Sequence, residues 1–303
     1  MGPKQFFSAS RVLIVAGKGG VGKTTVTAVL AHAAARSGLS VLVIDVDGKA
    51  GLAGLLGGDP AAVLGYEPEQ FPVDQRYGGS ISARSLTPER ALREYLETHN
   101  LGRLTRRFAT SGALDVVSTA TPGIGDLLVL GKIKQLEQSG VADLVLVDGP
   151  AAGHAVTMLT SAAGLLDSVS GGPIAKQAID VQALLTDPLR CRVLLVTVPE
   201  ATPVNEVIET GFALEDRVGV ALAPVVVNCV YPERDLDGPA TGAVGAAAEF
   251  RRARLAAQRR QLDRLATDLP IGRMTLPFLF TAGLTHADAL TLSRAALRQA
   301  VDR

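Results

Sequence analysis

The 303-residue chain has little cysteine and no net charge. Its two cysteines, Cys191 and Cys229, lie far apart in apolar runs, which argues against a disulfide scaffold and suits a reducing compartment. The 30 basic and 30 acidic residues balance each other. No strong global field therefore draws the chain to nucleic acid or to an anionic membrane.

Long uninterrupted apolar runs are also missing. The run from Val12 to Ala16 is too short for the hydrophobic region of a signal peptide. The longest other candidate, Ala151 to Leu166, is interrupted by Gly153, His154 and Gly164, whereas a membrane span needs about 20 apolar residues. We therefore expect a cytoplasmic protein without a transmembrane segment.

Hydrophobic residues are plentiful, at 47% of the chain, and they recur in short runs separated by helical patterns. Runs such as VLVID and VLLVTV are apolar throughout, which is typical of parallel strands covered on both faces. We expect strands at Val12–Ala16, Val41–Val46, Ile81–Leu86, Leu114–Ser118, Leu144–Val147, Val193–Val198, Ala221–Val227 and Ile271–Leu276. The pattern predicts an α/β fold in one domain, 1–303, with a doubly wound, mostly parallel sheet.

Two helical additions to this sheet are expected, at about 51–110 and 231–269. In the first, Arg103, Arg106 and Arg107 are interpreted as a solvated face. The core of the second, Glu249 to Ala266, carries six arginines and reads either as an amphipathic surface helix or as a contact for an acidic partner. No aromatic residue interleaves the arginines after Phe250, which argues against a stacking platform for single-stranded nucleic acid.

The stretch from Gly17 to Thr25 carries the clearest chemical signal. It lies between the first apolar run and a helical segment, Val26 to Ser37, and matches G-x-x-x-x-G-K-[ST]. The pattern predicts a loop whose N–H groups, with the helix N-terminus, bind phosphates; a glycine turn that binds nothing is the alternative. Lys23 would reach the β- and γ-phosphates, and the Thr24 hydroxyl would ligate Mg²⁺. The expected nucleotide-binding residues are Gly17, Gly19, Gly20, Val21, Gly22, Lys23, Thr24, Thr25 and Asn228.

Polar residues at the ends of predicted strands extend this site, because ligands bind at the carboxyl ends of strands in open α/β sheets. Asp47 is a candidate to orient the attacking water and Asp45 to support Mg²⁺, although an ordinary Asp-Gly turn accounts for the same residues. Asp148 follows four apolar residues in a Walker-B-like arrangement and would hold Mg²⁺ directly or through water. Asn228 either contacts an adenine edge or caps a turn. The loop after Asp148 is a candidate nucleotide switch.

Several segments together resemble the deviant Walker-A P-loop ATPases, the class of MinD, ParA, the nitrogenase iron protein and the arsenite-pump ATPase ArsA. The mark of that class is an early lysine, here Lys18, in K-G-G-x-G-K-T-T. The chain looks most like the ArsA branch, which includes the targeting ATPase for tail-anchored membrane proteins, and within it like the actinobacterial ArsA-like ATPases that occur as paired paralogues. The matching segments are Pro122–Asp126, Gly131–Lys134, Asp148–His154, Gly171–Pro173, Val198–Glu200 with Glu206, and Val227–Asn228.

The resemblance implies a Mg²⁺-dependent ATPase that works as a nucleotide-switched dimer, with itself or with a paralogue, and is coupled to a partner or client protein. In such a dimer Lys18 would reach across to the partner's phosphates, as an arginine finger does. The catalytic residues would be Lys18, Lys23 and Asp47. Thr24 and Asp148, with Asp45, would support the metal.

Departures from the ArsA pattern keep other functions open. Switch I, Asp47 to Ala50, is closer to the D-x-D of MinD, so a MinD/ParA-like positioning ATPase is one alternative. A catalytically weak nucleotide-binding scaffold for a paralogue is another. Without a Cys-x-x-C pair or clustered thiolates, arsenite binding is disfavoured. With only three methionines, a flexible Met-rich client groove is not evident.

Overall fold

The computed structural model describes residues 3–46, 48, 50–98, 123–168, 171–233 and 241–301. Nine strands within these ranges form one sheet in the order β3-β4-β2-β5-β1-β6-β8-β9, with β7 paired to β6. The strands are β1 Val12–Gly17, β2 Ser40–Asp45, β3 Glu69–Phe71, β4 Ser80–Ser85, β5 Leu144–Ala151, β6 Cys191–Thr197, β7 Ala221–Leu222, β8 Val225–Val230 and β9 Arg273–Pro277. Their pairings are parallel except that of β3 with β4.

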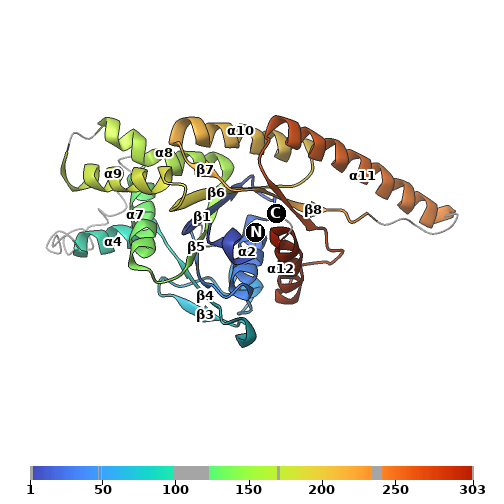
Figure 1. Ribbon diagram of the computed structural model, residues 1–303, viewed down its shortest axis with the longest axis horizontal. Coiled ribbons are helices and arrows are strands. Elements are labelled where there is room, and N and C mark those ends of the chain that lie inside the picture. The colour runs from blue at the N-terminus through green and yellow to red at the C-terminus, as the bar shows by residue number, and fades with distance from the viewer. Residues whose placement is uncertain are drawn as a thin grey trace.

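Helices cover both faces of this sheet (Figure 1). On one face lie α2 (Lys23–Arg36), α3 (Leu52–Leu56) and α12 (His286–Val301), with the short α1 (Pro3–Phe7) beside them. On the other lie α4 (Pro88–Thr98), α7 (Ile124–Ser139), α8 (Ala152–Ser168), α9 (Gly172–Thr186) and α10 (Ala201–Val218). The predicted doubly wound, mostly parallel α/β fold is confirmed.

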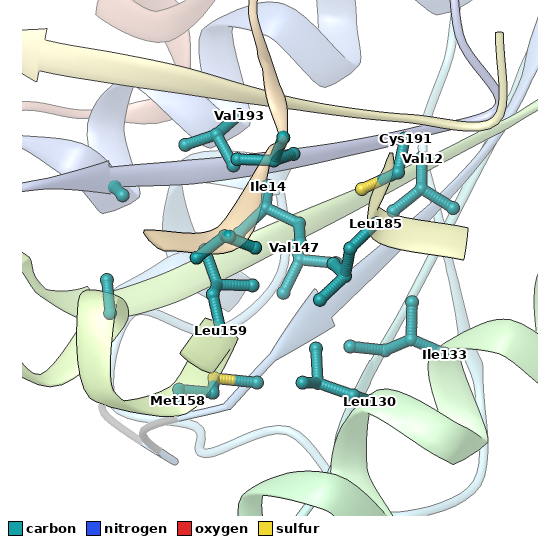
Figure 2. Close-up of a cluster of buried hydrophobic side chains, with 14 of the residues drawn as sticks. Val12, Ile14, Leu130, Ile133, Val147, Met158, Leu159, Leu185, Cys191 and Val193 are labelled. Atoms are coloured by element: carbon teal, nitrogen blue, oxygen red, sulfur yellow. The ribbon is translucent and has the colours of Figure 1, made fainter. Parts of the chain in front are cut away.

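The two-sided cover explains why the strand sequences are apolar without alternation. In β1, Val12 and Ile14 join the core on the side of α7 and α8, while Leu13 and Val15 join the core on the side of α2. Figure 2 shows the first of these cores, where side chains from β1, β5 and β6 meet those of α7 and α8. Since successive side chains of a strand point to opposite faces, both sets are buried.

Two strand expectations differ from the structure. The run Ala221–Val227 is split into β7 and β8, which both pair with β6, because Pro224 between them has no N–H to continue the ladder. The Ala223 N–H donates to the Val193 carbonyl oxygen of β6 and the Val225 N–H to that of Gly272. Beyond the proline, β8 pairs with β6 again at Val226 and Val227, and with β9 on its other side. The short antiparallel edge strand β3 was not predicted. The expected strand Leu114–Ser118 and the cluster Arg103, Arg106 and Arg107 lie outside the described residues.

The two additions also differ from simple helical insertions. The described part of 51–110 contains β3 and β4 as well as α3 and α4, so the sheet itself extends into the first addition. The second is dominated by α11, Gly242–Asp268, which projects from the body of the molecule (Figure 1). Ion pairs join Arg254 to Glu200 and Arg259 to Glu233 on its surface. These contacts are those of an amphipathic surface helix, and an acidic partner stays a prediction.

No helix in the described ranges combines the length and the apolar content that crossing a bilayer requires.

A buried histidine joins α2 to α3 and α12. The His32 ring is 2% exposed, its Nε2 lies 3.1 Å from the Leu55 carbonyl oxygen, and its centroid lies 5.1 Å from that of His286. Burial lowers the pKa of His32 from 6.5 to about 4; the Leu55 contact opposes this shift, and the charges of His286 and Arg36 add to it. The folded chain therefore holds His32 neutral.

This burial predicts acid sensitivity. Between pH 6.5 and about 4 the unfolded chain binds a proton at His32 that the folded chain does not, so stability is present above this window and lost as pH falls through it. The loss from His32 alone should be about 3 kcal/mol. Urea unfolding at pH 7 and pH 4.5 should show a smaller loss in His32→Gln than in the native chain, with the exposed His154→Gln as control. Equal losses in all three chains would assign the effect to other groups.

Candidate nucleotide-binding site

The glycine loop lies between the end of β1 and the start of α2, at the carboxyl edge of the sheet. Two of its glycines are required by close packing. A Cβ on Gly17 would lie 2.4 Å from the Val196 carbonyl oxygen of β6. Gly22 has φ +90°, and a Cβ there would lie 2.4 Å from Asn228 Nδ2. The loop is therefore held against β6 and β8, and α2 directs its N-terminus at this edge.

Both lysines of the loop make contacts within the chain. Lys23 Nζ lies 3.4 Å from the Lys18 carbonyl oxygen, so its side chain folds back over the loop. The Lys18 ammonium donates to Glu206 of α10 in an ion pair, and each of these side chains is about one-third exposed (36% and 37%). The predicted roles of both lysines toward phosphates stay predictions. Glu206 is a contact that spacing along the chain does not reveal.

Asp148 is brought to the first turn of α2 by the neighbouring strand β5. Thr24 Oγ1 donates to Asp148 Oδ2 at 2.7 Å, and Thr27 Oγ1 lies 3.2 Å from Asp148 Oδ1. Thr27 Oγ1 also lies 3.0 Å from the Lys23 carbonyl oxygen. The two residues proposed to support the metal, Thr24 and Asp148, are thus in direct contact. Thr27 was not singled out from the sequence, since a threonine inside a helix has no distinctive signal.

Asp45 lies beside Asp148, because the two are partners in the parallel ladder of β2 and β5. Asp148 is 6% exposed. Burial and, to a smaller extent, the charge of Asp45 raise its pKa to about 6, although the hydrogen bonds from Thr24 and Thr27 and the charge of Lys23 act in the opposite direction. Two buried carboxylates next to a hydroxyl form an all-oxygen donor set that fits Mg²⁺, since a cation there would offset their repulsion.

Of the two candidate aspartates at the end of β2, only Asp45 lies within the described residues. Asp45 Oδ1 accepts from the Gly48 N–H at 3.0 Å, so this side chain stabilises the turn that follows the strand. Asp47, the candidate for positioning water, lies outside the described residues, as does Lys49. Its role stays a prediction.

Asn228 supports the glycine loop. Its Nδ2 donates to the Val21 carbonyl oxygen at 3.0 Å, from a bulge where the pairing of β8 with β9 shifts register. Gln258 of α11 holds the far side of this bulge: Nε2 donates to the Cys229 carbonyl oxygen at 3.3 Å, and Oε1 accepts from the Tyr231 N–H at 2.9 Å. The adenine contact of Asn228 stays a prediction. The contacts of Gln258 were not predicted, although a glutamine on the buried side of an arginine-rich helix is a candidate for hydrogen bonds to the backbone beneath it.

The segment after Asp148 is more regular than expected. β5 continues to Ala151 and α8 begins at Ala152, so the expected switch loop is a strand end joined directly to a helix. A Cβ on Gly149 would lie 2.6 Å from the Val15 carbonyl oxygen, which requires glycine there. His154 is exposed, and its charge opposes the rise that burial causes in the pKa of Asp126. The start of α7 and the start of α8 are therefore electrostatic neighbours.

The two thiols lie apart. Cys191 is fully buried at the start of β6, and burial raises its pKa to about 12. Cys229 is half-buried, with φ 58°, at the β8 bulge, and burial raises its pKa too. Both are therefore neutral thiols at pH 7, and a metal or metalloid ligand has to be a thiolate. Among the residues that the structure describes, no three His, Cys, Asp or Glu side chains gather closely enough to hold a metal.

This arrangement of strand, glycine loop, helix and flanking aspartates is that of a nucleotide-binding domain. The family of CobQ/CobB/MinD/ParA nucleotide-binding domains matches residues 12–237, and the chain belongs to it. It is 34% identical to ATPase BagA of Mycobacterium tuberculosis over 79% of this chain and 72% of that protein. It is 28% identical to a putative arsenical pump-driving ATPase of Halobacterium salinarum, over 74% of this chain and 36% of that protein. It is 23% identical to ATPase GET3B of Arabidopsis thaliana, over 87% of this chain and 72% of that protein. The resemblance to ArsA-type ATPases is confirmed.

Proposed function

We propose that the chain hydrolyses ATP to ADP and phosphate as a Mg²⁺-dependent, nucleotide-switched dimer that is coupled to a partner or client protein. The observation that carries this proposal is the contact of Thr24 with buried Asp148 at the loop that presents Lys23. The names of the relatives, which are ATPases and arsenical pump-driving ATPases, support the same reaction.

Each group of this chain then has a chemical task. The N–H groups of the glycine loop and the Lys23 ammonium bind and orient the β- and γ-phosphates. Thr24 and Asp148 would hold Mg²⁺, with Asp45 beside them; when bound, the cation would neutralise charge on the phosphates. Asp47 is proposed to orient the attacking water. The buried position of Asp148 keeps bulk water away from this side of the phosphates.

A dimer, with a second copy or with a paralogue, is proposed from the early lysine. Lys18 would enter the neighbouring subunit's phosphate site, which requires that it leave Glu206. The side chains of that ion pair are partly exposed, so breaking it costs little, about 1 kcal/mol or less. Glu206 thus becomes a partner that holds Lys18 in the isolated chain. A cytoplasmic location also stays a prediction.

A MinD/ParA-like positioning ATPase is the second candidate, because the matching family includes MinD and ParA. ATP-dependent co-sedimentation of the purified chain with anionic liposomes or with DNA would favour it. Sedimentation that is independent of ATP, or none, would favour the ArsA-like proposal.

The central test is phosphate release from ATP by the purified chain, alone and mixed with its paralogue, with Mg²⁺ or with a chelator. We expect turnover that the chelator removes. Asp148→Asn should lower it about 10- to 100-fold, because it removes a charge that would hold the metal. Asp263→Asn, an exposed aspartate of α11, is the matched control and should retain the native rate. Nucleotide binding without turnover, both in the chain alone and in its mixture with the paralogue, would favour a catalytically weak scaffold instead.

A further inference from the structure

A cavity of about 540 Å³ lies between α4, α7 and α9. These helices lie together on one side of the molecule, on the face of the sheet opposite α2 (Figure 1). The cavity is therefore separate from the glycine loop. Its volume is in the range of pockets that bind small molecules.

Three lysines line this cavity, against two carboxylates. Lys134 is only 9% exposed, and its ammonium donates to Asp180 Oδ2 at 2.9 Å. Lys132 forms an ion pair with Glu94. Lys176 is exposed, and no ion pair or hydrogen bond of its side chain is found in the described part of the chain. Each carboxylate is therefore already matched by one lysine, and the third lysine is in excess.

The wall behind Glu94 adds another buried cation. The Arg84 guanidinium is 7% exposed and lies 4.3 Å over the Tyr66 ring, and the Tyr66 hydroxyl donates to Glu94. Burial opposes ionisation of Glu94, but hydrogen bonds from Lys132 and Tyr66 and the charges of Lys132 and Arg84 hold its pKa below the ordinary value. The negative charge on this wall is thus fully compensated, and the cavity has an excess of positive charge.

The remaining lining suits a ligand with a polar end and an apolar end. Three glutamine side chains supply amide donors, and Ala91 and Leu128 supply apolar surface. A lysine ammonium binds an oxyanion as a point charge and has three donors, of which Lys134 uses one on Asp180. Donors therefore remain for a ligand oxygen.

We propose that the cavity between α4, α7 and α9 binds a small organic oxyanion, a phosphate or carboxylate carried on an apolar group. The oxyanion lies among Lys132, Lys134 and Lys176, and the apolar group lies against Leu128. This site is additional to the nucleotide site and does not depend on ATP hydrolysis.

Calorimetry with three probes that share one ring tests the ligand class. The full chain, saturated with ADP and Mg²⁺ so that the glycine loop is occupied, is titrated with phenyl phosphate, benzoate and phenol. We expect at least one anion to bind, at least about tenfold more tightly than phenol, since phenol lacks the negative charge that would accept charge-assisted hydrogen bonds from the lysines. Preference for phenyl phosphate or for benzoate identifies the acidic group. Equal binding of phenol, or no binding of either anion at millimolar concentration, overturns the proposal.

Charge variants locate the binding. Lys176→Gln should weaken the binding of the preferred anion about three- to fivefold, as expected for loss of an exposed charge. Asp180→Asn should tighten it, because Lys134 is then released. Lys4→Gln, an exposed lysine on α1, is the matched control and should leave affinity unchanged. The Lys23→Ala chain should still bind the anion, which separates this site from the glycine loop. Unchanged affinity in both Lys176→Gln and Asp180→Asn would place the anion elsewhere and overturn the proposal.

Discussion

Lys23→Ala is expected to abolish measurable ATP hydrolysis, with a loss of at least about 10²–10³-fold, and to weaken nucleotide binding as well. The ammonium would contact the β- and γ-phosphates in the ground state and in the transition state, so both binding and rate should suffer. Phosphate release and calorimetric titration with a non-hydrolysable ATP analogue measure the two effects. Lys4→Ala is the matched control, since Lys4 is an exposed lysine on α1.

The conservative variant Lys23→Arg sharpens this test. Its charge is kept, but a planar guanidinium does not fit a loop built around a compact ammonium. It should therefore retain part of the binding and little of the turnover. Native turnover in Lys23→Ala would show that this loop is not the hydrolytic site, and the proposed function would fall with it.

Lys18→Ala is expected to lower turnover by about 10³-fold while nucleotide binding stays close to native. The reason is that Lys18 would act on charge that develops in the neighbouring subunit's transition state. In the isolated chain its ammonium is held by Glu206. Single-turnover hydrolysis together with analogue binding separates this rate effect from a loss of affinity.

Mixing two inactive variants tests whether Lys18 acts across the dimer. A site with Lys23 from one chain and Lys18 from the other is intact in a mixed dimer of Lys18→Ala and Lys23→Ala chains. An equimolar mixture should therefore recover about a quarter of the native activity, since half the dimers are mixed and each has one intact site. If the dimer forms only with a paralogue, one variant in each partner leaves one intact site in every heterodimer, so about half of the native activity is expected. No recovery in either arrangement would place Lys18 in its own chain's site.

Glu206→Gln completes this series. It removes the carboxylate that binds Lys18 in the isolated chain. If that ion pair only holds Lys18 back, activity should stay at the native level or rise. A loss equal to that of Lys18→Ala would instead show that Glu206 positions the lysine for the reaction.

The features that sequence reasoning predicted are those that depend on near neighbours along the chain. Strands β1, β2, β5 and β6 were recognised because both of their faces are buried and their residues are apolar without alternation. The loop from Gly17 to Thr25 was recognised because its spacing is contained within nine consecutive positions of one strand–loop–helix unit.

Local chemistry also accounts for where prediction failed. β7 and β8 were predicted as one strand because apolar residues continue through Ala223, yet Pro224 interrupts the ladder on β6, which resumes at Val226. The edge strand β3 has three residues, two of them exposed, so no apolar pattern marks it. The switch segment after Asp148 was expected to be a loop from its glycines, but Gly149 serves close packing against β1 within a strand.

The sequence by itself determined that this is a nucleotide-binding α/β protein, because each apolar strand and the phosphate loop consist of consecutive residues. Only the tertiary structure decided how that loop is supported. The contacts of Thr24 with Asp148, Lys18 with Glu206 and Asn228 with Val21 join residues 124, 188 and 207 positions apart. No local pattern specifies such pairs, since they arise when parallel strands align their carboxyl ends at one edge and bring separate segments within hydrogen-bond distance.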